Sequence, residues 1–81
     1  MSWNYRMTRR TVGNDQFYEV REIYYDRAGN PTSWTVDAMS PFGETKKELV
    51  LSLLSMARCL THPVLDLDTR EWLPMFPARR R

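Results

Sequence analysis

The spacing of the apolar residues changes near Gly43, and this change constrains the fold more than any other feature of the chain. Before Gly43, residues 17–25 and 33–38 alternate as β-strands do, whereas Leu49 and Leu53 begin a repeat with helical spacing. The pattern predicts an α+β fold. In it, a three-stranded antiparallel β-meander packs against one α-helix, and an extended segment follows at the C-terminus.

Three strands are expected before Gly43. Residues 3–8 alternate between apolar and polar side chains, and a turn at 12–15 leads into a second strand at about 16–25. The second strand carries apolar residues on both faces, so we interpret it as a central strand; a bulge near Arg21 is the alternative. The buried row of the third strand is expected to be Trp34, Val36 and Ala38.

One helix is expected at about 46–60. Thr45 and Glu48 have the spacing of a capping box, and Pro63 ends the helix because the residue before a proline avoids the α conformation. The apolar residues of one broad helical arc are expected to face the sheet: Leu49, Val50, Leu53, Leu54, Met56, Ala57 and Leu60. Leu51 lies outside this arc, which makes it a candidate interface residue.

A chain of 81 residues fits a single domain. We place this domain at residues 1–68 and treat 69–81 as a C-terminal tail, partly docked or disordered. Residues 64–68 are expected to run extended along the sheet, and a weak capping box at 68–71 predicts one further helical turn. Because a small domain leaves apolar surface exposed, we expect a homodimer.

Composition restricts the compartment and the partners. The single cysteine, Cys59, excludes an internal disulfide and fits a reducing compartment. The chain has no apolar run of the roughly 18 residues that span a membrane, and its N-terminus lacks the apolar core of a signal peptide. We therefore expect a cytoplasmic protein without membrane association. The net charge of +2 depends on arginines 79–81, without which it would be −1, and this disfavours nucleic-acid binding.

No residue pattern indicates catalysis or metal binding. Cys59 and His62 have the spacing of two zinc ligands, but the chain holds no other cysteine or histidine, and structural zinc takes four ligands. Asp66 and Asp68 lack the further oxygen ligands of a cation site. Because no phosphate loop, nucleophile elbow or dinucleotide fingerprint is present, we expect no catalytic residues, metal, cofactor or enzymatic activity.

Four short blocks occur in order along the chain. They are residues 3–6 (Trp-Asn-Tyr-Arg), 22–26 with 29–31 (Glu-Ile-Tyr-Tyr-Asp, Gly-Asn-Pro), 43–45 (Gly-Glu-Thr) and 63–66 (Pro-Val-Leu-Asp). Together they resemble a family of short uncharacterised bacterial proteins over about residues 2–66, which implies no function. The chain is more loosely similar to HicB-like antitoxin domains, which share the element order and a Gly-acidic-Thr helix entry. That similarity implies a non-catalytic domain that dimerises and covers a partner protein.

Aromatic residues gather on the predicted strands, and one helix can cover only one face of the sheet. The rings could stack on single-stranded bases, form a protein interface, or be buried by the C-terminal segment. We expect a non-enzymatic protein-binding module, as a small regulatory, adaptor or phage-type inhibitor protein. Its partner-binding residues are expected to be Trp34, Tyr24, Leu51, Arg58 and Trp72. The alternative is a nucleic-acid-binding protein that uses the sheet aromatics with Arg6, Arg9 and Arg10.

Overall fold

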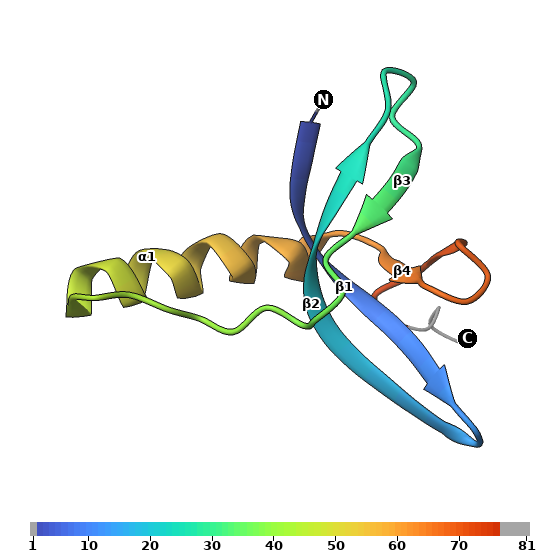
Figure 1. Ribbon diagram of the computed structural model, residues 1–81, viewed down its shortest axis with the longest axis horizontal. Coiled ribbons are helices and arrows are strands. Elements are labelled where there is room, and N and C mark those ends of the chain that lie inside the picture. The colour runs from blue at the N-terminus through green and yellow to red at the C-terminus, as the bar shows by residue number, and fades with distance from the viewer. Residues whose placement is uncertain (1, 77–81) are drawn as a thin grey trace, which may run out of the picture.

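A long two-stranded hairpin forms the centre of the computed structural model, which describes residues 2–76 (Figure 1). Strand β1 (Ser2–Val12) pairs antiparallel with β2 (Asp15–Tyr25) along its whole length. The two-residue turn between them places Gly13 at φ 61°, a conformation that glycine adopts without the steric cost of a side chain. The predicted turn at 12–15 is therefore confirmed.

Three further strands complete the sheet. β3 (Pro31–Trp34) pairs antiparallel with β2, β4 (Val64–Asp66) lies parallel to β1, and β5 (Trp72–Leu73) pairs antiparallel with β4. The strand order is β3-β2-β1-β4-β5. β2 is thus an interior strand, as its apolar residues on both faces predicted.

The predicted three-stranded antiparallel meander is wrong, because the structure has a five-stranded mixed sheet. The first three strands do pair antiparallel, but the chain then returns through the helix and inserts β4 beside β1 in the parallel direction. A parallel neighbour requires a crossover connection, so its partner residues are far apart in the sequence. The expectation that residues 64–68 run extended along the sheet is confirmed for 64–66, but a strand of only three residues has no periodicity that indicates its pairing with β1.

Helix α1 (Lys46–Ala57) continues into a 3₁₀ turn, η1 (Arg58–Thr61). The capping box is confirmed: the Thr45 hydroxyl accepts from the Glu48 amide at 3.2 Å, and the Glu48 carboxylate accepts from the Thr45 amide at 3.1 Å. The helix ends before the extended residue that precedes Pro63, as predicted.

The core lies on both faces of the sheet near β4. Ile23, Tyr25 and Leu65 form one buried cluster, against which Trp34 and Leu67 pack. The other buried apolar side chains come from the end of the helix and from β4: Met56, Cys59 and Val64.

The buried residues predicted for the helix and the third strand are largely wrong. Of the residues in α1, only Met56 is buried, and Figure 1 shows the helix projecting past the edge of the sheet. Val36 is 90% exposed and Ala38 is also exposed, because β3 ends at Trp34 and the chain leaves the sheet there.

The predicted helical turn after residue 68 is also wrong. Residues 67–69 form a turn, and Trp72–Leu73 forms β5. Part of the segment assigned to the tail therefore belongs to the sheet, whereas arginines 79–81 lie outside the described residues. Within residues 2–76, no helix combines the length and the apolar character that crossing a membrane requires.

Candidate functional site

The first candidate site is an apolar surface on α1, defined by Leu49, Val50, Leu51, Leu53 and Leu54. These five side chains are 39–58% exposed. The stretch from Leu49 to Ala57 contains no charged residue. A helix that is apolar around most of its circumference is normally buried, so this α1 surface lacks a covering element among the described residues.

One side of α1 is covered by the coil that precedes it. The Phe42 amide donates a hydrogen bond to the Ser52 hydroxyl at 3.2 Å. Gly43 lies so close to the first turn that a Cβ there would stand 2.3 Å from the Leu49 nitrogen. Only glycine fits this close contact. The coil therefore lies against one side of the helix, and the α1 surface stays open on the remaining sides of the helix.

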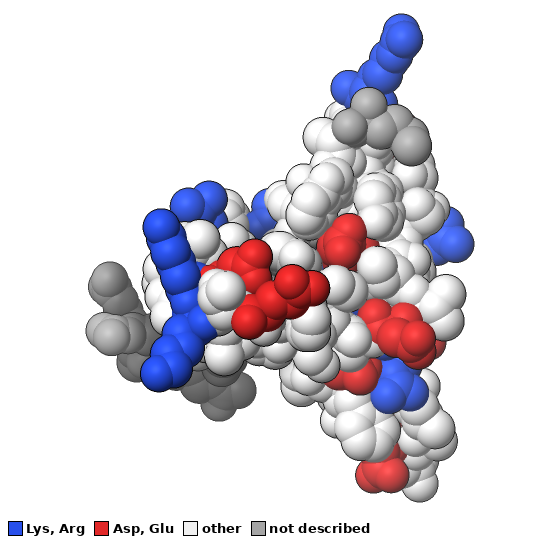
Figure 2. All heavy atoms as spheres, turned by 60° about the vertical axis from the view of Figure 1, so that its left-hand side comes forward, with Lys and Arg blue, Asp and Glu red and all other residues white. Residues whose placement is uncertain are grey.

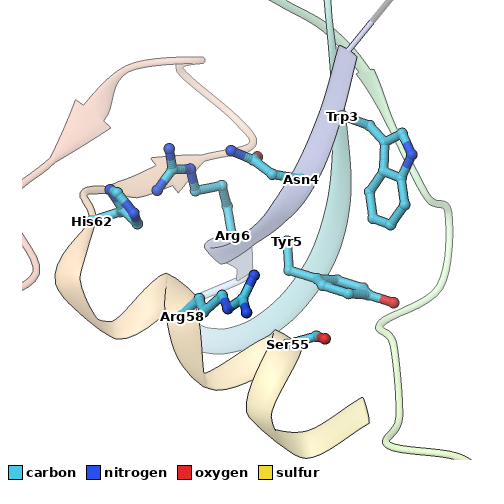
Figure 3. A pocket seen from close by; sticks show the side chains of 7 residues that line it. All are labelled: Trp3, Asn4, Tyr5, Arg6, Ser55, Arg58 and His62. Atoms are coloured by element: carbon cyan, nitrogen blue, oxygen red, sulfur yellow. The ribbon is translucent and has the colours of Figure 1, made fainter. Parts of the chain in front are cut away.

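The second candidate site is a pocket of about 340 Å³ beside the N-terminal half of β1 (Figure 3). Its lining comes from two elements: Trp3, Asn4, Tyr5 and Arg6 of β1, and Ser55, Arg58 and His62 of the helix and its end. We call it the β1-edge pocket. Two arginines and no carboxylate line it, which makes it suited to an anionic group.

The hydrogen bonds of Arg6 leave most of its guanidinium unused. Its Nε donates to the Tyr25 hydroxyl at 3.4 Å, and that hydroxyl donates to the Asn4 side-chain oxygen at 2.6 Å. The guanidinium lies 5.7 Å from the centre of the Trp72 ring. Within residues 2–76, the buried Arg6 Nη1 has no hydrogen-bond partner, which is uncommon for a buried polar atom.

Other arginines of the sheet are paired. Arg10 and Arg21 contact the Glu19 carboxylate at 3.0 and 3.2 Å, and the buried Arg21 also donates to the Thr8 hydroxyl at 2.9 Å. Arg9 donates to the Asp66 carboxylate through Nε at 2.7 Å. Of the three arginines predicted for nucleic-acid binding, Arg9 and Arg10 are therefore engaged by carboxylates, and as neighbours on a strand they point to opposite faces. The third, Arg6, has no carboxylate partner within residues 2–76.

Figure 2 shows acidic side chains over the middle of one face, with basic side chains mostly at its edges. The middle of this face thus offers little of the continuous positive surface that tracks a phosphate backbone.

The predicted partner-binding residues fall on different parts of the molecule. Leu51 belongs to the α1 surface, and Arg58 lines the β1-edge pocket. Trp34 packs against the core with Arg70 5.4 Å from its ring centre, while Trp72 is 39% exposed. The Tyr24 hydroxyl donates to Glu22 at 2.7 Å, and this hydrogen bond raises the pKa of Tyr24.

The sequence analysis predicted neither of these two surfaces. It expected most of the apolar helix residues to lie in the core, because the same spacing of apolar residues is typical of a buried helix face. It also named Arg6 and Arg58 for different functions, because nothing in the sequence indicates that residues so far apart line one pocket.

Cys59 has none of the properties of a reactive thiol. It is buried, and burial raises the pKa of its thiol, whereas a nucleophilic cysteine needs a lowered one. Among residues 2–76, no group of three or more histidine, cysteine, aspartate or glutamate side chains is placed to hold a metal ion.

Asp66 joins β4 to both β1 and the following turn. One carboxylate oxygen accepts from the amides of Asp68 and Thr69 at 2.9 and 3.0 Å, and the other accepts from Arg9. The Thr69 amide, followed by the Arg9 side chain and the Asp68 amide, holds the pKa of Asp66 below its ordinary value. Hydrogen bonds from Arg10 and Arg21 likewise lower the pKa of Glu19.

These lowered pKa values predict a loss of stability in acid. Because the unfolded chain binds protons more readily than the folded one at Asp66 and Glu19, both groups stabilise the fold above their ordinary pKa of about 4. That contribution disappears as the pH falls from about 5 through the folded-state values. We expect the urea midpoint at fixed protein concentration to fall between pH 5 and pH 3, and to fall less in Asp66→Asn. If the urea midpoint of Asp66→Asn falls with pH as steeply as that of the unaltered chain, Asp66 does not contribute to the loss of stability in acid.

Comparisons with known proteins found no matching family model, no matching curated protein and no matching solved structure. The resemblance to a family of short bacterial proteins and the looser similarity to HicB-like domains therefore stay predictions.

Proposed function

We propose that this protein is a non-enzymatic protein-binding module that works as a homodimer held together by the α1 surface. The supporting observation is the uncharged stretch from Leu49 to Ala57, which lies on a helix whose aliphatic side chains are largely exposed. An exposed apolar surface of this kind marks a site of contact with another protein chain, which is what a small regulatory or adaptor protein needs.

The area of the isolated chain supports a partner of substantial size. A folded monomer of 9.7 kDa is expected to expose about 5,100 Å², yet this chain exposes 6582 Å². If about 1,100 Å², the most that six residues can expose, is subtracted for the residues outside 2–76, about 5,480 Å² remains. A folded chain of the remaining length is expected to expose about 4,800 Å², so the excess is about 650 Å². Each partner of a standard interface buries about 800 Å², so the excess matches one partner's share.

A second copy of the chain is the occupant that these features favour. In a two-fold dimer the same surface meets itself, so any charge near the axis faces a like charge. The stretch from Leu49 to Ala57 has no such charge, and self-pairing therefore brings no repulsion along its length. Homodimer interfaces are also more apolar than transient ones, as this helix is.

Nucleic-acid binding receives less support. Arg9 and Arg10, two of the three arginines expected to contact a phosphate backbone, are engaged by Asp66 and Glu19. Breaking those ion pairs would offset part of any gain from the phosphates. Binding of a nucleic acid is therefore included only as one possible result of the experiments described below.

The dimer predicts that a charge in the α1 surface will separate the protomers. Leu54→Glu and Leu51→Glu are expected to convert a dimer into a monomer, because burying an unpaired carboxylate in an apolar interface is unfavourable by several kcal/mol. Both leucines are more than half exposed in the single chain, so the fold itself should persist. Sedimentation equilibrium measures the mass, and circular dichroism checks the fold.

Val12→Glu provides the matched control. Val12 is 51% exposed at the hairpin end, as apolar and as accessible as the α1 leucines but far from them along the fold. This variant is expected to remain dimeric. An unaltered chain that sediments as a monomer at all concentrations up to the millimolar range would refute the proposal, as would a dimer that survives both leucine substitutions.

A further inference from the structure

The N-terminal half of β1 has an open edge among the described residues. β4 pairs with β1 only beside Arg9 and the residue before it, so residues 2–6 pair with β2 on one side alone. The Arg9 carbonyl accepts a hydrogen bond from the Leu67 amide on the β4 side. The amide and carbonyl groups of successive residues point to alternate sides of a strand. Tyr5 and Trp3 are an even number of residues from Arg9, so their backbone groups point to the same side as those of Arg9, and this side is open at residues 2–6.

The β1-edge pocket lies along this open edge. The end of the helix forms its other wall, and Figure 3 shows Arg58 and Ser55 rising from the helix toward Tyr5 and Arg6 of β1. Its volume of about 340 Å³ is near the lower limit for ligand pockets. It therefore accommodates one side chain or one terminal group rather than a large molecule.

Unlike Arg9, Arg10 and Arg21 of the sheet, the two arginines of this pocket have no carboxylate partner within residues 2–76. The exposed Arg58 guanidinium forms no hydrogen bond or ion pair with a described residue, and the buried Nη1 of Arg6 has no acceptor. Because Nη1 has no surface open to solvent, a ligand in the pocket contacts Arg6 through its other atoms, together with the exposed Arg58.

We propose that the β1-edge pocket binds the carboxylate of an acidic, extended peptide segment, which pairs its backbone with β1 at Trp3 and Tyr5. An extended peptide can add a strand to an exposed sheet edge, where backbone hydrogen bonds provide affinity and a side-chain pocket provides specificity. Guanidinium groups match a carboxylate in geometry and charge, so Arg6 and Arg58 select an acidic side chain at that position.

The open edge favours a peptide over a nucleic acid. A single-stranded nucleic acid needs exposed rings on which successive bases stack and a basic path for its backbone. Here the Trp3 ring is half-exposed, but it packs edge to face against Tyr5, with ring centres 5.3 Å apart, and so does not form a parallel stack with it. The next two arginines along β1, Arg9 and Arg10, are already paired. A ligand that uses backbone pairing and one local charge needs no such basic path.

The test uses a six-residue peptide of alternating valine and glutamate with blocked ends, and its counterpart with glutamine in place of glutamate. We expect titration by NMR to move the amide signals of residues 3–6 and 55–62 with the glutamate peptide. The glutamine peptide should bind at least tenfold more weakly, as the loss of a charge-assisted hydrogen bond implies. Arg58→Gln should weaken glutamate-peptide binding by about the same factor.

Arg27→Gln is the matched control, because Arg27 is exposed in the β2–β3 loop and its side chain has no partner among residues 2–76. It should bind the peptide unchanged. Arg6→Lys, which keeps the charge but not the planar donors, should bind less tightly than the unaltered chain. Equal affinity for the two peptides would overturn the proposal. So would tighter binding of inorganic phosphate or of oligothymidylate than of the glutamate peptide.

This inference is independent of the dimer. The monomeric Leu54→Glu variant is expected to bind the glutamate peptide as the unaltered chain does, because Leu54 does not line the pocket. A failure of self-association therefore leaves the peptide result interpretable, and a failure of peptide binding leaves the α1 proposal intact.

Discussion

Replacing Asp66 by alanine is expected to lower the free energy of unfolding by about 3 kcal/mol, a loss typical of breaking a buried hydrogen-bonded charge. The side chain is 2% exposed and accepts hydrogen bonds from two backbone amides and from Arg9. Its removal leaves those donors without their acceptor in a partly buried position. Domains of this length have a total stability of roughly 4–12 kcal/mol, so the variant would be close to unfolding at ambient temperature.

Asp66→Asn should be less damaging. Its side-chain oxygen can still accept from the Asp68 and Thr69 amides, which preserves the turn after β4, whereas the charge opposite Arg9 is lost. We expect a loss of about 1–2 kcal/mol, as for one charge-assisted hydrogen bond.

Urea denaturation at pH 7 and fixed protein concentration measures both variants, since dimer stability depends on concentration. Asp37→Ala is the control, because Asp37 is exposed and its carboxylate has no partner among the described residues. It should change the stability by no more than about 0.5 kcal/mol. A similar loss in Asp37→Ala and Asp66→Ala would show that Asp66 has no special role.

Leu65→Ala is also expected to cause a large loss of stability. Leu65 is fully buried between β1 and β5, and it packs in the cluster with Ile23 and Tyr25. Truncating a buried leucine removes favourable burial and leaves a cavity, at a typical cost of 2–5 kcal/mol, and we expect about 3 kcal/mol here. Thermal unfolding followed by circular dichroism should show a midpoint lower by more than about 10 °C.

Val36→Ala tests the opposite case. The alternation of the sequence predicted that Val36 is buried, but the structure leaves it 90% exposed. Its truncation should therefore shift the midpoint by only a degree or two, within the range of ordinary surface substitutions. A large loss in Val36→Ala with a small loss in Leu65→Ala would mean that β3 continues through residues 35–38 and that β4 does not lie in the core.

The features that the sequence determined by itself are local. The hairpin follows from alternation interrupted by a turn glycine, and the helix boundaries follow from the Thr45–Glu48 capping box and from Pro63. In each case the residues that decide the conformation are within a few positions of one another. Their preferences therefore act before any tertiary contact forms.

The features that only the tertiary structure decided depend on distant residues. Arg9 and Asp66 are 57 positions apart, and no local pattern indicates that they meet where β4 joins β1. Once β4 occupies that place, β1 is covered along one part of its edge and open along the other, with Arg6 and Arg58 beside the opening. Periodicity shows which side chains of a helix share a face, but contacts between distant segments determine what covers that face. For this reason the same leucines that predicted a core helix form an exposed surface.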